Sequence, residues 1–180
     1  MVVKLICAKF DILILLGMKI LLAILALSLI SLNSSDSVSL LPDVIVQDLN
    51  GNEINTKTFS NDGKPILVIL WATWNSPGKR QMNVLHEIYE DWQEETGVKV
   101  IGISLDDARN KHKVKPYVES KGWTYEVYLD SKQSFAKKVN AENPPHTSLY
   151  NGNGELVWQK NGFVDGDEDE ILEQLKKVTH

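Results

Sequence analysis

Hydrophobic and polar positions along this chain alternate in patterns that predict strands and helices in turn. Ile66 to Leu70 is apolar at every position, which is typical of a strand buried on both faces of a sheet. Apolar residues then recur at helical spacing from Met82 to Trp92, which predicts a helix from about Pro77 to Glu95. Asn75 stands at the N-cap position of that helix, and a proline lies in its first turn. A buried strand therefore leads directly into a helix, and the junction holds the first candidates for function.

Similar patterns extend the arrangement in both directions along the chain. Two Asn-Gly turns between short apolar segments predict two hairpins, one before the central strand and one near the C-terminus. Alternating strands and helices fill the region between them. The expected segments are a hairpin over 44–59, strands at 66–70, 98–104, 123–129, 147–150 and 155–160, and helices at 77–95, 106–121, 131–139 and 167–178. This order predicts an α/β fold with a central mixed sheet flanked by helices and an added N-terminal β-hairpin.

Residues 1–33 have the pattern of an export signal. Ile20 to Leu32 is an apolar run of 13 residues, which suits a signal peptide better than a membrane span of about 20 residues. A retained N-terminal membrane anchor is the alternative, and translation from Met18 is a second open point. Residues 34–41 are then a polar linker, and residues 42–180 form the folded domain. We expect that domain to be exported, in the periplasm or on the outer face of a bacterial cytoplasmic membrane.

Charge and cysteine content narrow the function of the domain. The formal net charge is −5, and residues 1–33 contribute +2 through three lysines and one aspartate, so the remaining chain carries −7. Nucleic-acid binding needs a basic face and is not expected. Membrane contact is expected only through the N-terminal segment. The one cysteine, Cys7, lies in that segment, so the exported domain has no thiol and must be stable through its core.

Short segments of the domain match the pattern of a known family. These segments are Gly63-Lys64-Pro65, Trp71-Ala72-Thr73-Trp74, Pro77, Lys79, and Pro145 before Thr147. From about Pro42 onward the chain resembles the exported thioredoxin-like proteins of the TlpA/ResA type. The resemblance implies a thioredoxin-like fold. In that family a Trp-Cys-x-x-Cys motif, often followed three residues later by a glutamate, and a neighbouring cis-proline loop reduce or isomerise disulfides at the cell envelope.

The reactive positions of that motif are replaced in this chain. Asn75 and Gly78 stand at the two cysteine positions, and Gln81 stands at the position of the acid. A dithiol works because one thiolate attacks a disulfide and the second thiol resolves the mixed disulfide, which neither an amide nor a glycine can do. No catalytic residue is therefore expected. By the resemblance Pro145 is the cis-proline, so Pro144 occupies the position that pairs with substrate, and it has no N–H to donate.

The residues that remain at the junction predict a binding surface. We expect it to consist of Trp74, Asn75, Ser76, Pro77, Gly78, Pro144, Pro145 and His146. No second histidine, cysteine or carboxylate is placed near His146, so no metal and no cofactor is expected. The expected function is non-catalytic binding of a protein or peptide partner, or a chaperone-like role, in the cell envelope. The alternative is a thiol-disulfide oxidoreductase, or a peroxiredoxin-like antioxidant protein, that works through a partner's thiols. Its weakness is that no residue of the domain can form the covalent intermediate.

Overall fold

A computed structural model of the chain describes residues 39–179, so the predicted signal and Cys7 lie outside the described residues. Within that range the predicted order of strands and helices is confirmed. The elements are β1 (Ile45–Asp48), β2 (Glu53–Asn55), the 3-10 helix η2 (Thr56–Thr58), β3 (Ile66–Trp71), α2 (Ser76–Thr96), β4 (Lys99–Ser104), the 3-10 helix η3 (Lys111–Lys113), α3 (Val114–Lys121), β5 (Glu126–Leu129), α4 (Ser134–Lys138), β6 (His146–Tyr150), β7 (Leu156–Asn161) and α5 (Asp167–Val178). None of these helices combines the length and the apolar character needed to cross a membrane.

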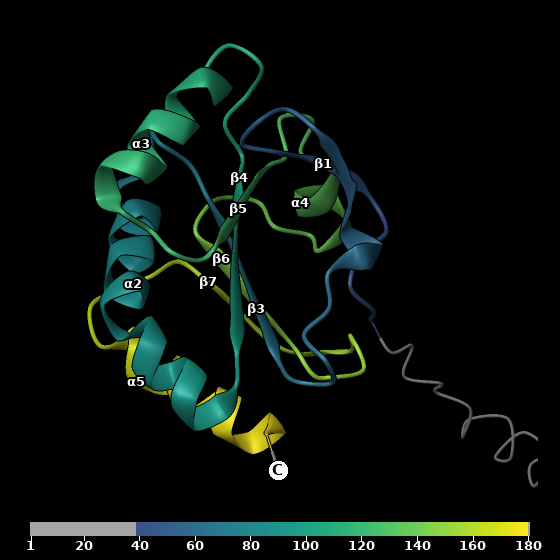
Figure 1. The fold of residues 1–180 in the computed structure, drawn as a ribbon, viewed down its shortest axis with the longest axis vertical. Helices are drawn as coiled ribbons and strands as arrows, with labels where there is room; N and C mark the ends of the chain where they lie inside the picture. Colours follow the sequence, from purple (N-terminus) through teal and green to yellow (C-terminus); the bar gives the residue numbers. More distant parts are fainter. Residues whose placement is uncertain (1–38, 180) are drawn as a thin grey trace, which may run out of the picture. The chain divides into compact units, whose positions relative to one another are not determined.

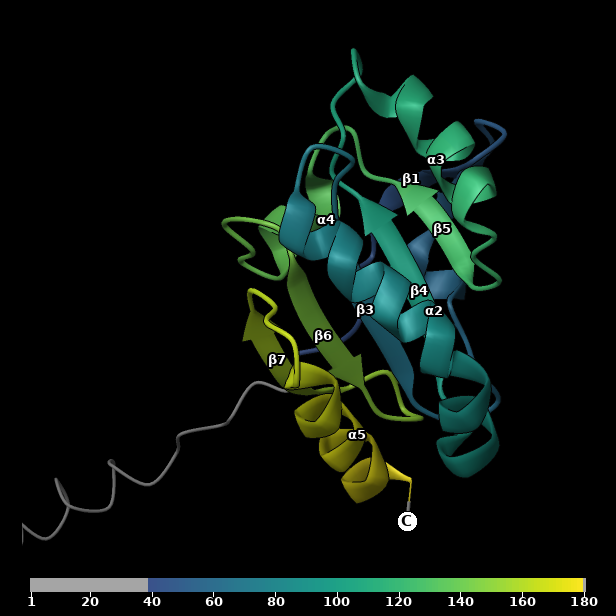
Figure 2. The same ribbon diagram turned by 90° about the vertical axis from the view of Figure 1, so that its left-hand side faces the viewer.

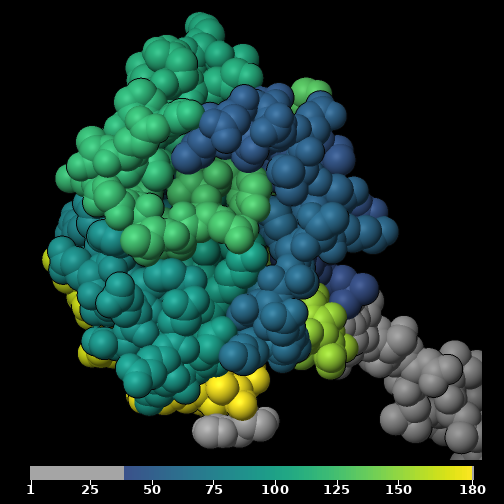
Figure 3. Space-filling model, viewed as in Figure 1, coloured from purple at the N-terminus to yellow at the C-terminus, as the bar shows by residue number. Residues whose placement is uncertain are grey.

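The strands of the described region form one mixed sheet in the order β2-β1-β5-β4-β3-β6-β7. β3, β4 and β5 run parallel, whereas the N-terminal hairpin and the β6–β7 hairpin pair antiparallel with their neighbours. In the space-filling view the blue atoms of the N-terminal hairpin lie beside the green atoms of the segment that contains β5 (Figure 3), as the β1–β5 pairing requires. β3 lies between β4 and β6, and Leu70 near its end pairs with His146. The end of β3 and the Pro144–Pro145 loop are therefore neighbours.

β3 is the centre of the core because helices cover both faces of the sheet there. Leu67, Ile69 and Trp71 pack with residues of α2, α3 and α5 in one apolar cluster. The alternate residues of β3 pack with residues of α4 and the N-terminal hairpin in the second cluster. Figure 1 shows α2, α3 and α5 on one side of the strands and α4 on the other, and Figure 2 shows α2 and α5 in front of the sheet. This two-sided burial explains why the strand has no polar position.

Two helices begin later than their apolar patterns predict. The helix predicted from Asp106 begins at Val114, and the helix predicted from Ser131 begins at Ser134. In each case an aspartate after a strand is buried, with 0% exposure at Asp106 and 2% at Asp130. Asp130 caps α4 by accepting the N–H of Ser134 at 2.8 Å. A buried carboxylate needs hydrogen-bond donors. Asp130 receives them from the first turn of α4, and Asp106 receives them from Thr73 and Ser104, so each aspartate lies before its helix and not inside it.

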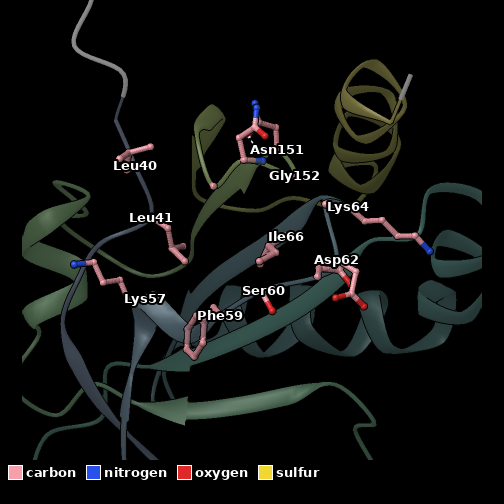
Figure 4. Close-up of a pocket in the computed structure, with 14 residues that line it drawn as sticks. Leu40, Leu41, Lys57, Phe59, Ser60, Asp62, Lys64, Ile66, Asn151 and Gly152 are labelled. Atoms are coloured by element: carbon pink, nitrogen blue, oxygen red, sulfur yellow. Dashed lines mark hydrogen bonds between the residues drawn. The ribbon is translucent and has the colours of Figure 1, made fainter.

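The folded part begins within the predicted linker. Leu40 forms a β-bridge with Glu155, and the N–H of Leu41 donates to the Gly154 carbonyl at 2.9 Å. Figure 4 shows Leu40 and Leu41 at a cavity of about 350 Å³, where they lie near Ile66 and the β6–β7 turn. Ile66 is the first residue of β3, so this cavity lies at the opposite end of that strand from the junction with α2.

Candidate functional site

A side-chain cap closes the start of α2. Asn75 has extended backbone angles, and its Oδ1 accepts the N–H of Gly78 at 2.7 Å. The N–H of Lys79 donates to the Asn75 carbonyl at 3.1 Å. The predicted N-cap is confirmed. An uncharged side-chain amide therefore accepts an N–H of the first helical turn. By the resemblance, this is the position of the attacking thiolate in the TlpA/ResA-type proteins.

Gly78 is required by this cap for reasons of space. A Cβ at residue 78 would lie 2.7 Å from Asn75 Oδ1 and 3.3 Å from the Cβ of Trp71. The first distance is shorter than real Cβ contacts, so a larger residue would force the asparagine side chain to move. Glycine costs up to about 1 kcal/mol against alanine inside a helix, and here the cost accompanies a cap worth a similar amount. Asn75 and Gly78, which the resemblance assigns to the two cysteine positions, are thus structurally coupled.

Gln81, which the resemblance assigns to the position of the acid, is a buried contact between α2 and β6. It is 1% exposed, and its Nε2 donates to Thr147 Oγ1 at 2.7 Å. An ionised carboxylate at this depth would need compensating donors, whereas the neutral amide is held by one hydroxyl. Gln81 therefore ties the helix to the strand that follows the proline loop.

The proline loop has the geometry that the resemblance implied. The Pro144–Pro145 peptide bond is cis. Pro145 is buried and Pro144 is half-buried. The Pro144 carbonyl has no hydrogen-bond partner among residues 39–179, and proline has no N–H. Toward a bound segment this position therefore offers an acceptor and no donor.

His146 does not belong to the surface, and its inclusion there was wrong. Its side chain is 1% exposed, with Nδ1 2.6 Å from Asn161 Oδ1 and Nε2 3.1 Å from Ser148 Oγ. Strand alternation puts residues 146, 148 and 150 on one face of β6, and Tyr150 is part of the cluster that contains α4. A serine, a histidine and an asparagine in this order resemble a hydrolytic triad, but Ser148 is itself 1% exposed and cannot meet a substrate.

Trp74 and Val164 are the large apolar side chains exposed where the loops meet. Trp74 is 59% exposed, as predicted, while Trp71 is fully buried in the core. Val164, in the loop between β7 and α5, is 65% exposed and was not predicted. That loop is tied to the proline loop by the Gly162 N–H, which donates to the Pro145 carbonyl at 2.8 Å. The sequence signal for it was two adjacent apolar residues, Phe163 and Val164, in a loop of glycine and aspartate, and it did not show that Phe163 is the one that is buried.

A buried aspartate holds the loop that carries Trp74. Asp106 accepts the N–H of Thr73 at 2.8 Å, the hydroxyl of Thr73 at 2.5 Å and the hydroxyl of Ser104 at 2.8 Å. Because Thr73 immediately precedes Trp74, these bonds hold the backbone from which the Trp74 side chain projects. Asp106 is a positioning residue that the sequence pattern did not reveal.

The side of the site next to α3 is aromatic and basic. The ring of Tyr117 lies 5.8 Å from that of Trp71, and the ammonium groups of Lys79 and Lys121 lie 5.7 and 5.9 Å from the Tyr117 ring centroid. These are cation–π distances. Burial raises the pKa of the Tyr117 phenol above its ordinary value, so the hydroxyl stays neutral beside the two lysines.

The sheet order, the cis-proline and the strand–helix junction define a thioredoxin-like fold. The AhpC/TSA family profile matches residues 39–166. Since that match spans more than half of the chain, the protein belongs to the AhpC/TSA family.

Individual relatives support the TlpA/ResA type within that family. A thiol-disulfide oxidoreductase ResA from Bacillus thuringiensis subsp. konkukian is 27% identical over 138 residues, which cover 77% of this chain and 76% of the relative. An uncharacterized thioredoxin-like protein from Porphyromonas gingivalis is 34% identical, covers 80% of this chain and 94% of its own, and superposes with a TM-score of 0.70. StoA from Bacillus subtilis shares the fold at 22% identity, covering 79% and 99%, with a TM-score of 0.59. The predicted resemblance is confirmed.

Coupling between Asn75 and Gly78 is measurable as a double-mutant cycle. Gly78→Ala should destabilise the protein despite its better helix propensity, because the new Cβ meets Asn75 Oδ1. Asn75→Ala should cost about 1 kcal/mol through loss of the cap. In the double variant the clash disappears. The sum of the two single losses in unfolding free energy should therefore exceed the loss in the double variant by at least about 0.5 kcal/mol, measured by urea unfolding. Additive effects would contradict the coupling, and Glu90→Ala, exposed on α2, serves as the control.

Asp106→Asn should loosen the Trp74 loop. The substituted amide keeps the shape of the side chain but turns one acceptor into a donor, which leaves a Thr73 or Ser104 donor unpaired at a cost of about 1–3 kcal/mol. The indole N–H resonance of Trp74, assigned with Trp74→Phe, should move or broaden. Asp107→Asn, on the neighbouring half-buried aspartate, should leave that resonance unchanged. An unshifted Trp74 signal in Asp106→Asn would remove Asp106 from this role.

Proposed function

We propose that this protein is a thioredoxin-like binding domain of the cell envelope with no thiol chemistry of its own. A segment of a partner protein binds across the three-loop surface, defined as Trp74, Asn75, Ser76, Pro77, Pro144 and Val164. The observation that carries the proposal is the bond from the Gly78 N–H to Asn75 Oδ1. It occupies the helix start with a group that cannot attack a disulfide, and residues 39–179 contain no cysteine that could replace it.

The composition of the three-loop surface supports binding. Trp74 and Val164 are more than half exposed, and Pro77 and Pro144 beside them are rigid and half-buried. Exposed apolar residues scattered singly are ordinary on proteins, but a group of them on loops tied together by hydrogen bonds is typical of an interaction site. Tryptophan and proline lose little side-chain entropy on binding, so such a surface binds at low conformational cost.

Export is part of the proposal. The signal predicted in residues 1–33 would deliver the domain to the periplasm or to the outer face of the cytoplasmic membrane. Disulfides form readily in that compartment. A domain without cysteines cannot be trapped there in mixed disulfides, so it would hold a partner through contacts alone.

The second candidate is thiol-disulfide exchange, or a peroxiredoxin-like antioxidant role, through a partner's thiols. Membership of the AhpC/TSA family and the activity in the name of the ResA relative favour it. In such a reaction both sulfur atoms would belong to partners, and this chain would only hold them together. No residue at the start of α2 would take part in bond formation.

An insulin-reduction assay separates the two candidates. With dithiothreitol as the reductant, the unaltered protein should give no rate above background. Asn75→Cys combined with Gly78→Cys should give a rate at least about tenfold above background, because a dithiol at a helix start is activated and the obstructing asparagine is gone. The matched double serine variant at the same two positions should be inactive. Turnover by the unaltered protein, alone or with added thiol peptide, would favour the second candidate.

A further inference from the structure

A small cleft adjoins the three-loop surface. Its volume is about 230 Å³, and its walls are Glu142, Asn143, Pro144, Asn161 and Gly162. Pro144 belongs to both the cleft and the surface, and Gly162 lies two residues before Val164. A segment that lies over Trp74 and Val164 therefore has this cleft within reach of its next side chains.

The polar groups of the cleft favour a cation. Glu142 is exposed and makes no ion pair with any residue from 39 to 179. The Pro144 carbonyl is a further acceptor without a partner in that range. Asn161 has its Oδ1 occupied by His146, so its amide nitrogen is the opposing donor. A full negative charge and a free carbonyl outweigh the neutral side-chain amides of Asn143 and Asn161, which suits a lysine or arginine side chain.

The charges around the three-loop surface differ between its two sides, and the side next to the cleft is the acidic one. Beyond Val164 the chain is acidic. Asp165 pairs with Arg80 of α2 at 3.3 Å, whereas Glu168 and Asp169 at the start of α5 make no ion pair with any residue from 39 to 179. On the other side of the site, Lys79 and Lys121 flank Tyr117. The chain after residue 33 carries a net charge of −7, which attracts basic segments over a distance. A basic group is thus repelled at the α3 side and attracted at the Glu142 side.

We propose that the three-loop surface binds an extended, cysteine-independent segment of another protein in which a large apolar residue lies within two positions of a lysine or arginine. The apolar side chain contacts Trp74, Pro144 and Val164, and the cation enters the cleft at Glu142. One segment N–H donates to the Pro144 carbonyl. Full strand pairing at that residue is excluded because it exchanges two bonds and Pro144 has no N–H. This inference rests on the proposed function and names its partner.

Capped peptides without cysteine test the inference on the full chain. The probe is acetyl-Gly-Ser-Lys-Phe-Ser-Gly-amide, with versions that move the lysine by up to two positions, replace lysine by glutamate, or replace phenylalanine by alanine. Affinity is measured from the Trp74 indole N–H shift. The best lysine peptide should bind about fivefold more tightly than its glutamate counterpart at low salt, and the difference should shrink in 0.5 M salt. The alanine version should lose most of the binding.

Variants assign the contacts to residues. Glu142→Gln should bring lysine and glutamate peptides within about twofold of each other, whereas Glu94→Gln, exposed on α2, should leave the preference intact. Val164→Ser should weaken binding of every phenylalanine peptide, and Val157→Ser, at 43% exposure on β7, should not.

The outcomes separate this inference from the proposed function. Binding that depends on phenylalanine but shows no lysine preference, or a preference that survives Glu142→Gln, overturns the inference and leaves the proposed function standing. Absence of binding by every peptide overturns both.

Discussion

The hydrogen bond between the Gly78 N–H and Asn75 Oδ1 is the interaction on which the rest of the candidate site depends. It completes the first turn of α2 with an uncharged group, and it leaves no room for a side chain at residue 78. A thioredoxin-like protein normally keeps its helix start open to a thiolate, because the unpaired amides there lower the thiol pKa. Here the asparagine side chain accepts the Gly78 amide, so the helix start is capped by a group that is not a nucleophile.

Hydrogen bonds to neighbouring elements hold the loops of the site in place. Asp106 holds the loop before Trp74, Gln81 joins α2 to β6 through Thr147, and Gly162 ties the β7–α5 loop to the proline loop. Each contact crosses between elements far apart in the chain, and each polar group involved would be costly to leave unpaired. The loops are therefore rigid where they meet, and their apolar tips face outward. Such rigidity lowers the entropic cost of holding a partner.

Electrostatics distinguishes the two ends of the surface. Lysines stack on Tyr117 at one end, while Glu142 and the acidic start of α5 lie toward the other. The acidic residues of α5 are partly engaged within the fold: burial alone would raise the pKa of Asp167, but bonds from Lys160 and the Val164 N–H hold it below its ordinary value. Asp167 therefore fixes the loop of Val164, whereas Glu142 makes no ion pair with any residue from 39 to 179.

The sequence by itself determined the order of strands and helices, the burial of β3 on both faces and the cap at Asn75, because periodicity and capping act over a few neighbouring residues. It also shows that residues 39–179 contain no cysteine. The tertiary structure alone decided that His146 is buried, that Val164 joins the surface and that Asp106 holds a loop instead of starting a helix. Those outcomes depend on which strand lies beside which, since a side chain's partners come from the neighbouring strand or loop and not from its own segment.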